Sequence, residues 1–304
     1  VDYQNDATAK DIKLALKEGF KSIEHVKRYT TTGMGTDQGK LGNMHALGII
    51  ADTAGIKVGE LGTTTFRPPY TPLTFGTMVG RNVGEYFDAF RRTPMNDWHI
   101  ENKAEFENVG QWKRAWYYPK NDETMHDAVQ RESKAARDSA GILDASTLGK
   151  IDIQGTDASE FLNRVYTNAW SKLAIGKCRY GLMLNEDGMV YDDGVTTRLD
   201  ENHYIMTTTT GGAANVLSKL EDYLQTEWPE LDVYLSSVTD HYATASVCGP
   251  NSKKILNKII PDLDLSDENF PHMSFKNAKI GNIKCRVMRI SFTGEHSYEI
   301  NVQA

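Results

Sequence analysis

Residues 180–198 read YGLMLNEDGMVYDDGVTTR, and this stretch carries the strongest signal for the fold. Two runs rich in apolar and β-branched residues, 180–184 and 189–198, flank the polar tetrapeptide 185–188. A short polar segment that ends in glycine is typical of a tight turn between antiparallel strands. The stretch therefore predicts a β-hairpin, and with it a sheet that is at least partly antiparallel.

The second strand of this hairpin carries two adjacent aspartates, which side-chain alternation should place on opposite faces. Asp193 shares a face with Tyr191 and Val195, whereas Asp192 has polar company that includes a possible partner, Arg198. A carboxylate among apolar side chains is costly unless it is paired or used, and its pKa tends to rise. Asp193 is therefore a candidate proton acceptor or a partner for a cationic substrate nitrogen; a hydrogen-bonded structural aspartate is the alternative.

A second informative stretch, residues 292–300, reads FTGEHSYEI. Residues 293–295 predict a turn, after which Tyr298 and Ile300 face one way and Glu299 faces the other. On its own, Glu299 is compatible with a solvated strand carboxylate. A carboxylate can also accept two parallel N–H bonds from an amidine-like edge, such as that of a pterin.

The rest of the sequence mixes helix and strand signals. Hairpins combined with helices predict an α+β fold built on a largely antiparallel sheet. Helices are expected in three segments of 8–54 and at 124–140, 156–165, 213–228 and 252–260. Strands are expected within 142–153, at 204–208, at 244–247, and in a second hairpin of 284–291 with 297–302.

Residues 67–120 differ in composition from both of their flanks. Prolines recur, as in the run 67–72, RPPYTP, and three of the five tryptophans lie in this segment. Proline disfavours continuous helix, and so many aromatic side chains are costly to expose to water. We therefore expect an extended connecting arm that packs on another surface of this chain or of a partner. It would join a small helical domain at 1–66 to an α+β domain at 121–304.

Composition limits the class of protein. The 304 residues include 34 Lys and Arg against 41 Asp and Glu, and this net charge of −7 argues against nucleic acid or an anionic membrane as a partner. No apolar run reaches the roughly 20 residues that a membrane-spanning helix needs. Three well-separated cysteines predict reduced thiols in a cytoplasmic protein. The chain does not begin with Met and stops directly after a strand-like run, so we expect a piece of a longer chain.

Other candidate chemistry is weaker. The loop 33–39 lacks the third glycine of a dinucleotide-binding fingerprint and follows a helix, so a turn between helices is the better interpretation. The histidines show no metal-ligand spacing, and no metal site is expected. Cys178 has no histidine neighbour in the sequence, which disfavours a nucleophilic role.

Three motifs resemble the glycine-cleavage T-protein (aminomethyltransferase) superfamily and occur in the order found in that family. Residues 185–193, NEDGMVYDD, resemble its N-E-x-G-G-x-x-D-D strand, and residues 292–300 resemble its G-Y-T-G-E-x-G-Y-E-I segment. Residues 143–150, LDASTLGK, resemble its F-D-x-S-x-x-G-K strand. Segments along the whole chain, among them 24–31, 66–72 and 92–99, resemble the α subunit of heterotetrameric sarcosine oxidase. The resemblance implies a small helical domain, an aromatic-rich connection, and a T-protein-like folate domain truncated at its C-terminal end.

The resemblance also implies a reaction. Sarcosine would be oxidatively demethylated to glycine with production of hydrogen peroxide, and the one-carbon unit would pass to tetrahydrofolate, giving 5,10-methylenetetrahydrofolate. The partners would be the β, γ and δ subunits, with FAD and FMN on or at the interface with a partner subunit and NAD on a region upstream of this segment. The tetrahydrofolate site would be shared and incomplete here, so the segment is not expected to be active alone.

Site residues follow from the same motifs by position. Asp193 matches the family aspartate that meets folate N10 and the incoming one-carbon unit, Glu299 matches the pterin-binding glutamate, and Tyr180 matches an aromatic residue beside the folate. Thr208 and Leu148 match contact positions where many T-proteins have Asn and Met. Phe292 replaces the usual Tyr and removes one hydroxyl.

Two other functions are compatible with these residues. One is a stand-alone folate-dependent aminomethyltransferase or demethylase, and the other is a non-catalytic assembly module with a vestigial folate site. The helical region and the proline-rich arm argue against the first, because free T-proteins lack them. The presence of both Asp193 and Glu299 argues against the second. The N-methyl amine itself cannot be read from this segment, since the amine-oxidising site would lie on another subunit.

Overall fold

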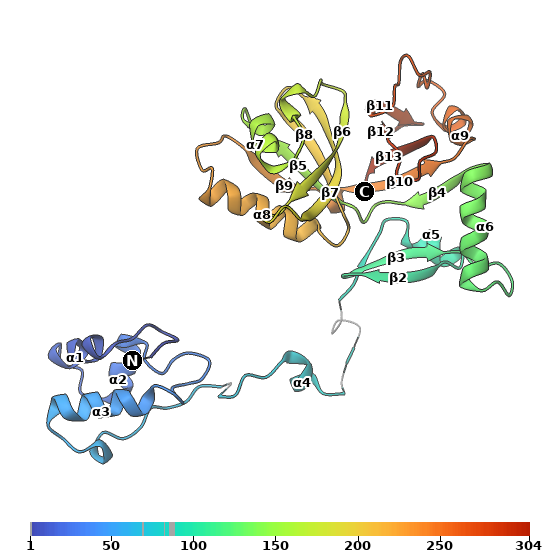
Figure 1. The fold of residues 1–304 in the computed structure, drawn as a ribbon. Coiled ribbons are helices and arrows are strands. Elements are labelled where there is room, and N and C mark those ends of the chain that lie inside the picture. The colour runs from blue at the N-terminus through green and yellow to red at the C-terminus, as the bar shows by residue number, and fades with distance from the viewer. Residues whose placement is uncertain (1, 69, 82, 85–88) are drawn as a thin grey trace. The chain divides into compact units, whose positions relative to one another are not determined.

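The computed structural model describes residues 2–68, 70–81, 83–84 and 89–304, and the chain divides into two compact units, Val1–Asp88 and Ala89–Ala304 (Figure 1). The boundary between the units lies inside the segment predicted as a connecting arm. The first unit is built from helices in its described residues, and the second combines helices with three sheets. Within the described ranges, no helix has both the length and the apolar character needed to cross a membrane.

Three helices pack around one apolar cluster in the first unit. They are α1 (Ala9–Lys17), α2 (Ile23–Thr30) and α3 (Asn43–Ala54). Helix α1 begins with a capping box formed by Thr8 and Asp11, in which each side chain accepts from the backbone N–H of the other residue. The buried faces of the three helices meet in a cluster that includes Ile12, Val26 and Ile50. The helical region expected at this end of the chain is therefore present.

The glycine-rich loop 33–39 is a turn between α2 and α3, as expected. Gly33 and Gly39 have φ angles of 75° and 80°, and a Cβ at either position would collide with the side chain of Asn43. The backbone N–H of Gly33 donates to the Asp2 carboxylate at 2.6 Å. Because the side chain of Asn43 packs against the loop and this N–H already donates to the Asp2 carboxylate, the loop is not shaped to cradle a phosphate.

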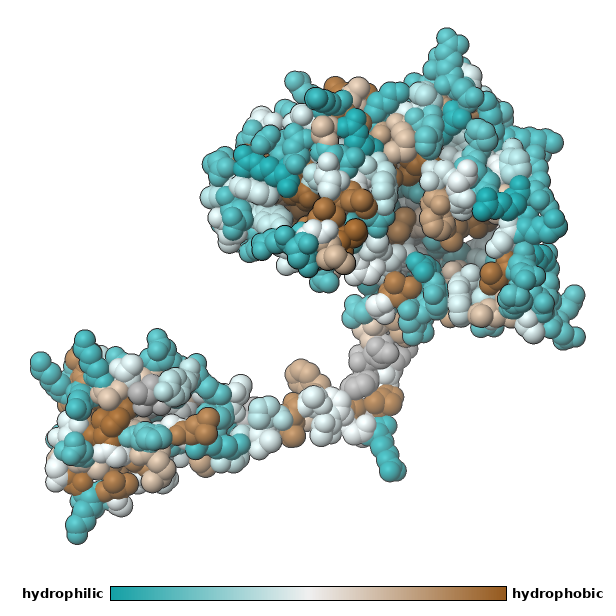
Figure 2. Space-filling view, in the orientation of Figure 1, coloured by the Kyte–Doolittle hydropathy of each residue, from teal (hydrophilic) through white to brown (hydrophobic). Residues whose placement is uncertain are grey.

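Residues 58–81 contain little regular structure. A 3-10 turn, η1 (Val58–Glu60), is followed by irregular chain and one short helix, α4 (Phe75–Val79). Phe75 is 81% exposed, and Figure 2 shows apolar colour along this part of the chain. The packing of this segment on another surface stays a prediction.

Residues 91–117 are more regular than the predicted extended arm. They form β1 (Arg91–Arg92), α5 (Asn96–Glu101), β2 (Glu105–Val109) and β3 (Trp112–Tyr117), with the sheet order β1-β3-β2. Gly110 supplies a φ of 58° at the tip of the β2–β3 hairpin. The expectation of an extended arm is therefore wrong for these residues. The nearest prolines, Pro94 and Pro119, lie outside the two hairpin strands, whose backbone N–H groups are free to pair.

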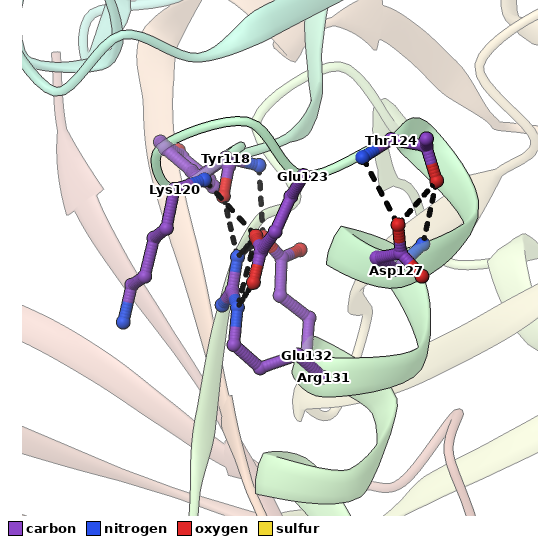
Figure 3. Close-up of polar contacts among 7 residues, drawn as sticks. All are labelled: Tyr118, Lys120, Glu123, Thr124, Asp127, Arg131 and Glu132. Carbon is purple, nitrogen blue, oxygen red and sulfur yellow. Dashed lines mark hydrogen bonds and ion pairs between the residues drawn. The ribbon is translucent and has the colours of Figure 1, made fainter.

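Polar contacts connect the chain after β3 to the first turns of helix α6 (Met125–Asp138) (Figure 3). Thr124 and Asp127 form a capping box there. Arg131 forms an ion pair with Glu123 at 2.8 Å and donates to the carbonyl of Tyr118 at 2.7 Å. The side-chain hydrogen bonds from Arg131 lower the pKa of Glu123 to about 2. One arginine therefore ties the segment after β3 to the first turns of α6.

The first of two five-stranded sheets, called here the β7 sheet, has the order β6-β7-β8-β5-β9. Its strands are β5 (Gly149–Gln154), β6 (Cys178–Leu184), β7 (Val190–Asp200), β8 (His203–Thr208) and β9 (Tyr234–Ser237). The predicted hairpin at 180–198 is the antiparallel pair β6–β7. One face is covered by α7 (Ala158–Val165), the 3-10 turn η2 (Trp170–Lys172) and α8 (Ala213–Thr226), which bury Phe161, Trp170 and Tyr204 against the strands.

The second sheet, called the β13 sheet, has the order β11-β12-β13-β10-β4. Its strands are β4 (Gly141–Asp144), β10 (Tyr242–Cys248), which follows the 3-10 turn η3 (Thr239–His241), β11 (Ser274–Ile280), β12 (Ile283–Arg289) and β13 (Ser297–Gln303). Helix α9 (Ser252–Ile259) covers one face, and the other face meets the β7 sheet through a cluster that includes Cys178, Ile205 and Met288. The predicted α+β class is confirmed, although β9 and β11 were not expected. The facing surfaces of the two sheets enclose what we call the inter-sheet space.

Candidate functional site

The carboxylate of Asp193 lies on the face of β7 that looks into the inter-sheet space. On this face Val195 packs into the cluster between the sheets, and Thr197 donates to the Cys178 thiol at 3.2 Å. From the neighbouring strand β6, Tyr180 donates its hydroxyl to Asp193 Oδ2 at 2.9 Å. Tyr180 is about 49% exposed and Asp193 is partly buried. The pair is therefore open to solvent while a hydrogen bond sets the orientation of the carboxylate.

The burial of the two adjacent aspartates is the reverse of the expectation. Asp192 is 5% exposed and accepts from the backbone N–H of Asp193 at 2.7 Å and from the backbone N–H and hydroxyl of Thr209 at 3.0 and 2.9 Å. It does not pair with Arg198, which donates to two backbone carbonyls. The cause is tertiary. The turn before α8 folds over this face of β7, where the backbone and hydroxyl of Thr209 reach the Asp192 carboxylate.

Glu299 is buried in the middle of the β13 sheet, so the interpretation as a solvated carboxylate is wrong. It lies opposite Ser246 of β10 and Met288 of β12, and it is 9% exposed. Met288 packs against the β7 sheet, so Glu299 also faces the inter-sheet space. Among the described residues no hydrogen bond reaches its carboxylate. Burial raises the pKa of Glu299 to about 6, and the positive charge of Lys150 opposes the rise.

Lys150 is a buried cation that the sequence did not single out. It is 2% exposed, and its ammonium donates to the carbonyls of Ala145 (3.4 Å), Ser146 (3.2 Å) and Leu148 (2.9 Å). Burial lowers the pKa of Lys150 to about 8, against the attraction of Glu299 and two aspartates. Alternation along β5 could have identified Lys150 as buried between the sheets. Ile151 and Ile153 point into the helix-covered core, so Lys150 points the other way, toward the inter-sheet space.

The other residues matched to the folate site lie in different surroundings. Leu148 is partly buried in the 145–148 loop that Lys150 holds. Thr208 is buried on the helix-covered side of the β7 sheet, where it pairs with Gly149 and its hydroxyl donates to the carbonyl of Thr209. Phe292 is 79% exposed in the turn before β13. The structure thus brings together Tyr180 and Asp193 directly and turns Glu299 toward the same space.

A relay of three side chains, two of them buried, supports the 145–148 loop and was also missed from the sequence. The Tyr118 hydroxyl donates to His99 Nδ1 at 2.6 Å, and the other ring nitrogen donates to Asp144 Oδ2 at 2.8 Å. Asp144 Oδ1 in turn accepts from the backbone N–H of Ser146 at 3.0 Å. Helix α5 and the chain after β3 therefore brace the beginning of the loop. No local pattern could have joined residues so far apart in the sequence.

Two further features bear on chemistry. Burial, with a smaller contribution from the nearby Glu299, raises the pKa of Cys178 to about 11, against the hydrogen bond from Thr197. The thiol is therefore a poor nucleophile at neutral pH. A cavity of about 840 Å³ opens at the ends of β10, β12 and β13, where Tyr242, Arg286 and Asn301 help to line it, and neither Asp193 nor Glu299 does. In the part of the chain that the structure describes, no three His, Cys, Asp or Glu side chains gather as metal ligands would.

Two family models match the chain. The GCVT N-terminal domain matches residues 95–304, which include both five-stranded sheets, and the sarcosine oxidase A3 domain matches residues 1–81. The crystal structure of the glycine cleavage system aminomethyltransferase T from Bartonella henselae shares the fold, with a TM-score of 0.59 at 23% identity over 71% of this chain and 54% of that one.

Individual relatives agree with both models. The aminomethyltransferase of Thermotoga sp. (strain RQ2) is 28% identical over 214 residues, which cover 70% of this chain and 55% of that protein. The sarcosine oxidase subunit alpha of Corynebacterium sp. (strain P-1) is 53% identical over 304 residues, which cover 99% of this chain but only 31% of that subunit. The chain thus spans about a third of the length of this relative. It belongs to the family of the GCVT N-terminal domain, here joined to a sarcosine oxidase A3 domain as in the α subunits of sarcosine oxidase that it resembles.

Proposed function

We propose that this chain is part of a sarcosine oxidase α subunit and contributes a one-carbon acceptor site to that enzyme. The enzyme would oxidatively demethylate sarcosine to glycine, release hydrogen peroxide, and transfer the one-carbon unit to tetrahydrofolate as 5,10-methylenetetrahydrofolate. The observation that carries the proposal is the pair of carboxylates, Asp193 on β7 and Glu299 on β13, that face one inter-sheet space. The 53% identity to a sarcosine oxidase α subunit supports it.

The surroundings of Glu299 fit a pterin. Glu299 is 9% exposed and no described residue donates to its carboxylate, so both oxygens are available to the donors of a ligand. The N–H groups along a pterin edge are such donors, and an ionised carboxylate can accept two of them in parallel. Glu299 would therefore bind and orient the ring system.

Asp193 would act on the reacting end of the ligand. Its carboxylate is oriented by the Tyr180 hydroxyl and open to solvent on its other side. There it would attract a cationic nitrogen and accept a proton as the one-carbon unit is taken up. Bound tetrahydrofolate supplies the nucleophilic nitrogens. The first half of a T-protein-like domain offers only part of such a site, so we propose that the rest comes from a longer chain.

The redox cofactors would lie elsewhere in the assembly. We propose FAD and FMN on or at the interface with a partner subunit, the β, γ and δ subunits as partners, and NAD on a region upstream of this segment.

The experiment is a binding measurement on the full-length protein assembled with its partner subunits. Isothermal titration with 5-formyltetrahydrofolate, a reduced folate that resists oxidation, should show binding at pH 7. Glu299→Gln should weaken this binding by about tenfold or more, since it loses a charge-assisted acceptor. The matched change Glu201→Gln, at an exposed glutamate, should have no effect. Binding that is absent from the wild type, or equal in both variants, would contradict the proposal and favour an assembly module.

A further inference from the structure

The ammonium of Lys150 lies at a junction between the two sheets. Its three acceptors, the carbonyls of Ala145, Ser146 and Leu148, all belong to the loop between β4 and β5. This short connection therefore wraps around one cation. Because Lys150 is 2% exposed, little solvent reaches these three carbonyls, and its ammonium is the donor that satisfies them.

The same loop is fastened to the strand beside Glu299. The backbone N–H of Ala145 donates to the carbonyl of Thr244 at 2.8 Å, and the N–H of Thr244 donates to the Ser146 hydroxyl at 2.9 Å. Thr244 lies on β10, two residues before Ser246, which is the register partner of Glu299. Lys150 of the β7 sheet and Glu299 of the β13 sheet thus face the same inter-sheet space, and the loop that Lys150 organises abuts the β13 sheet.

The charges around Glu299 leave Lys150 as its principal counter-charge among the described residues. The Cys178 thiol approaches from β6 and is neutral, since the burial described above keeps it protonated. Arg286 of β12 lies on the same face as Glu299, opposite Asn301, and its guanidinium lies over the Tyr242 and Phe275 rings. Asp144 and Asp240 also act on Lys150. Burial favours the protonated form of such a carboxylate, and the positive charge of Lys150 opposes this.

We propose that Lys150 is a positioning residue of the folate site: its ammonium holds the 145–148 loop in place and keeps the buried Glu299 carboxylate ionised, ready to accept pterin N–H groups. This inference rests on the proposed function. It assigns a role to a side chain that is not itself expected to touch the ligand. The neutral form of Glu299 would offer a donor in place of one acceptor, so loss of the Lys150 charge should weaken ligand binding in a pH-dependent way.

The test is the pH profile of 5-formyltetrahydrofolate binding in the assembled, full-length protein. Wild type should bind with nearly full affinity at pH 7 and lose affinity below about pH 6, where Glu299 takes up a proton. In Lys150→Met the midpoint should move up by about one unit or more, so that affinity falls roughly 3- to 10-fold at pH 6.5. At pH 9 the charge effect should vanish, because Lys150 itself, with a pKa of about 8, is then mostly uncharged, and any loss that remains in Lys150→Met should be the constant loss from the missing loop hydrogen bonds.

The control separates charge from loop structure. Ser146→Ala removes the hydrogen bond to Thr244 without changing any charge, so it should lower affinity equally at all pH values and leave the midpoint unchanged. A Lys150→Met midpoint equal to that of wild type would overturn the inference, whatever the affinity. If the wild type fails to bind, or Glu299→Gln binds as well as wild type, the proposed function fails instead.

A second variant and a direct measurement cover the case in which Lys150→Met does not fold. Lys150→Gln keeps a donor for the loop carbonyls but no charge, and it should show the same upward shift of the midpoint. Isotope-edited infrared spectroscopy of the Glu299 carboxylate in the wild type should show a second inflection near pH 8, as Lys150 loses its proton. The absence of that inflection would also overturn the inference.

Discussion

Two adjacent aspartates on β7 should respond very differently to the same isosteric change. Asp193 is partly buried and receives one hydrogen bond, from the Tyr180 hydroxyl, whereas Asp192 is buried and receives three. Asn keeps the shape of each side chain but loses its negative charge and half of its accepting capacity. Asp193→Asn should therefore lower the rate of one-carbon transfer, whereas Asp192→Asn should lower the stability of the fold.

The magnitudes follow from these contacts. In Asp193→Asn the remaining amide oxygen still accepts from Tyr180, so the free energy of unfolding should change by less than about 0.5 kcal/mol. If Asp193 is the general base, one-carbon transfer should fall on the order of 10²-fold or more. In Asp192→Asn the Thr209 hydroxyl or backbone N–H loses a charged acceptor in a buried place, which should cost about 1–3 kcal/mol.

The assay follows the fate of the carbon in the assembled enzyme supplied with sarcosine and tetrahydrofolate. Because amine oxidation is proposed for another subunit, Asp193→Asn should produce hydrogen peroxide at close to the native rate while free formaldehyde replaces methylenetetrahydrofolate. Asp192→Asn should shift the thermal unfolding midpoint down by several degrees and alter the product ratio much less. The reasoning is refuted if the two variants behave alike, or if Asp193→Asn forms methylenetetrahydrofolate at the native rate.

Two further predictions concern the supporting structure. Tyr118→Phe leaves His99 Nδ1 buried without its donor and should lower the free energy of unfolding by about 1–2 kcal/mol in chemical denaturation. An unchanged denaturation midpoint would show that this hydrogen bond does not contribute to stability. Since burial raises the pKa of Cys178 to about 11, the thiol should stay protonated through pH 9 and resist iodoacetamide in the folded protein, then react after unfolding. Rapid labelling of native protein at pH 8, located by peptide mass spectrometry, would contradict this.

Much of the local structure was predictable from short-range patterns. The capping boxes at Thr8 and Thr124 mark the first turns of α1 and α6, because a hydroxyl and a carboxylate three residues apart satisfy each other's backbone N–H groups. Alternation and a polar turn ending in Gly188 predicted the β6–β7 hairpin, and the same logic predicted the pairing of β12 with β13. These features depend on residues within a few positions of one another, so sequence alone carries them.

The sequence by itself therefore determined the α+β class, the hairpins and the strand positions of Asp193 and Glu299. Only the tertiary structure decided which aspartate is buried, since that depends on the turn before α8 folding back over β7. Only it brought the loop that Lys150 holds against β10, beside Glu299, and joined His99 to Asp144 across 45 residues. The physical reason is the same throughout: backbone geometry and side-chain period are local, whereas burial and the pairing of charges depend on which distant surfaces meet.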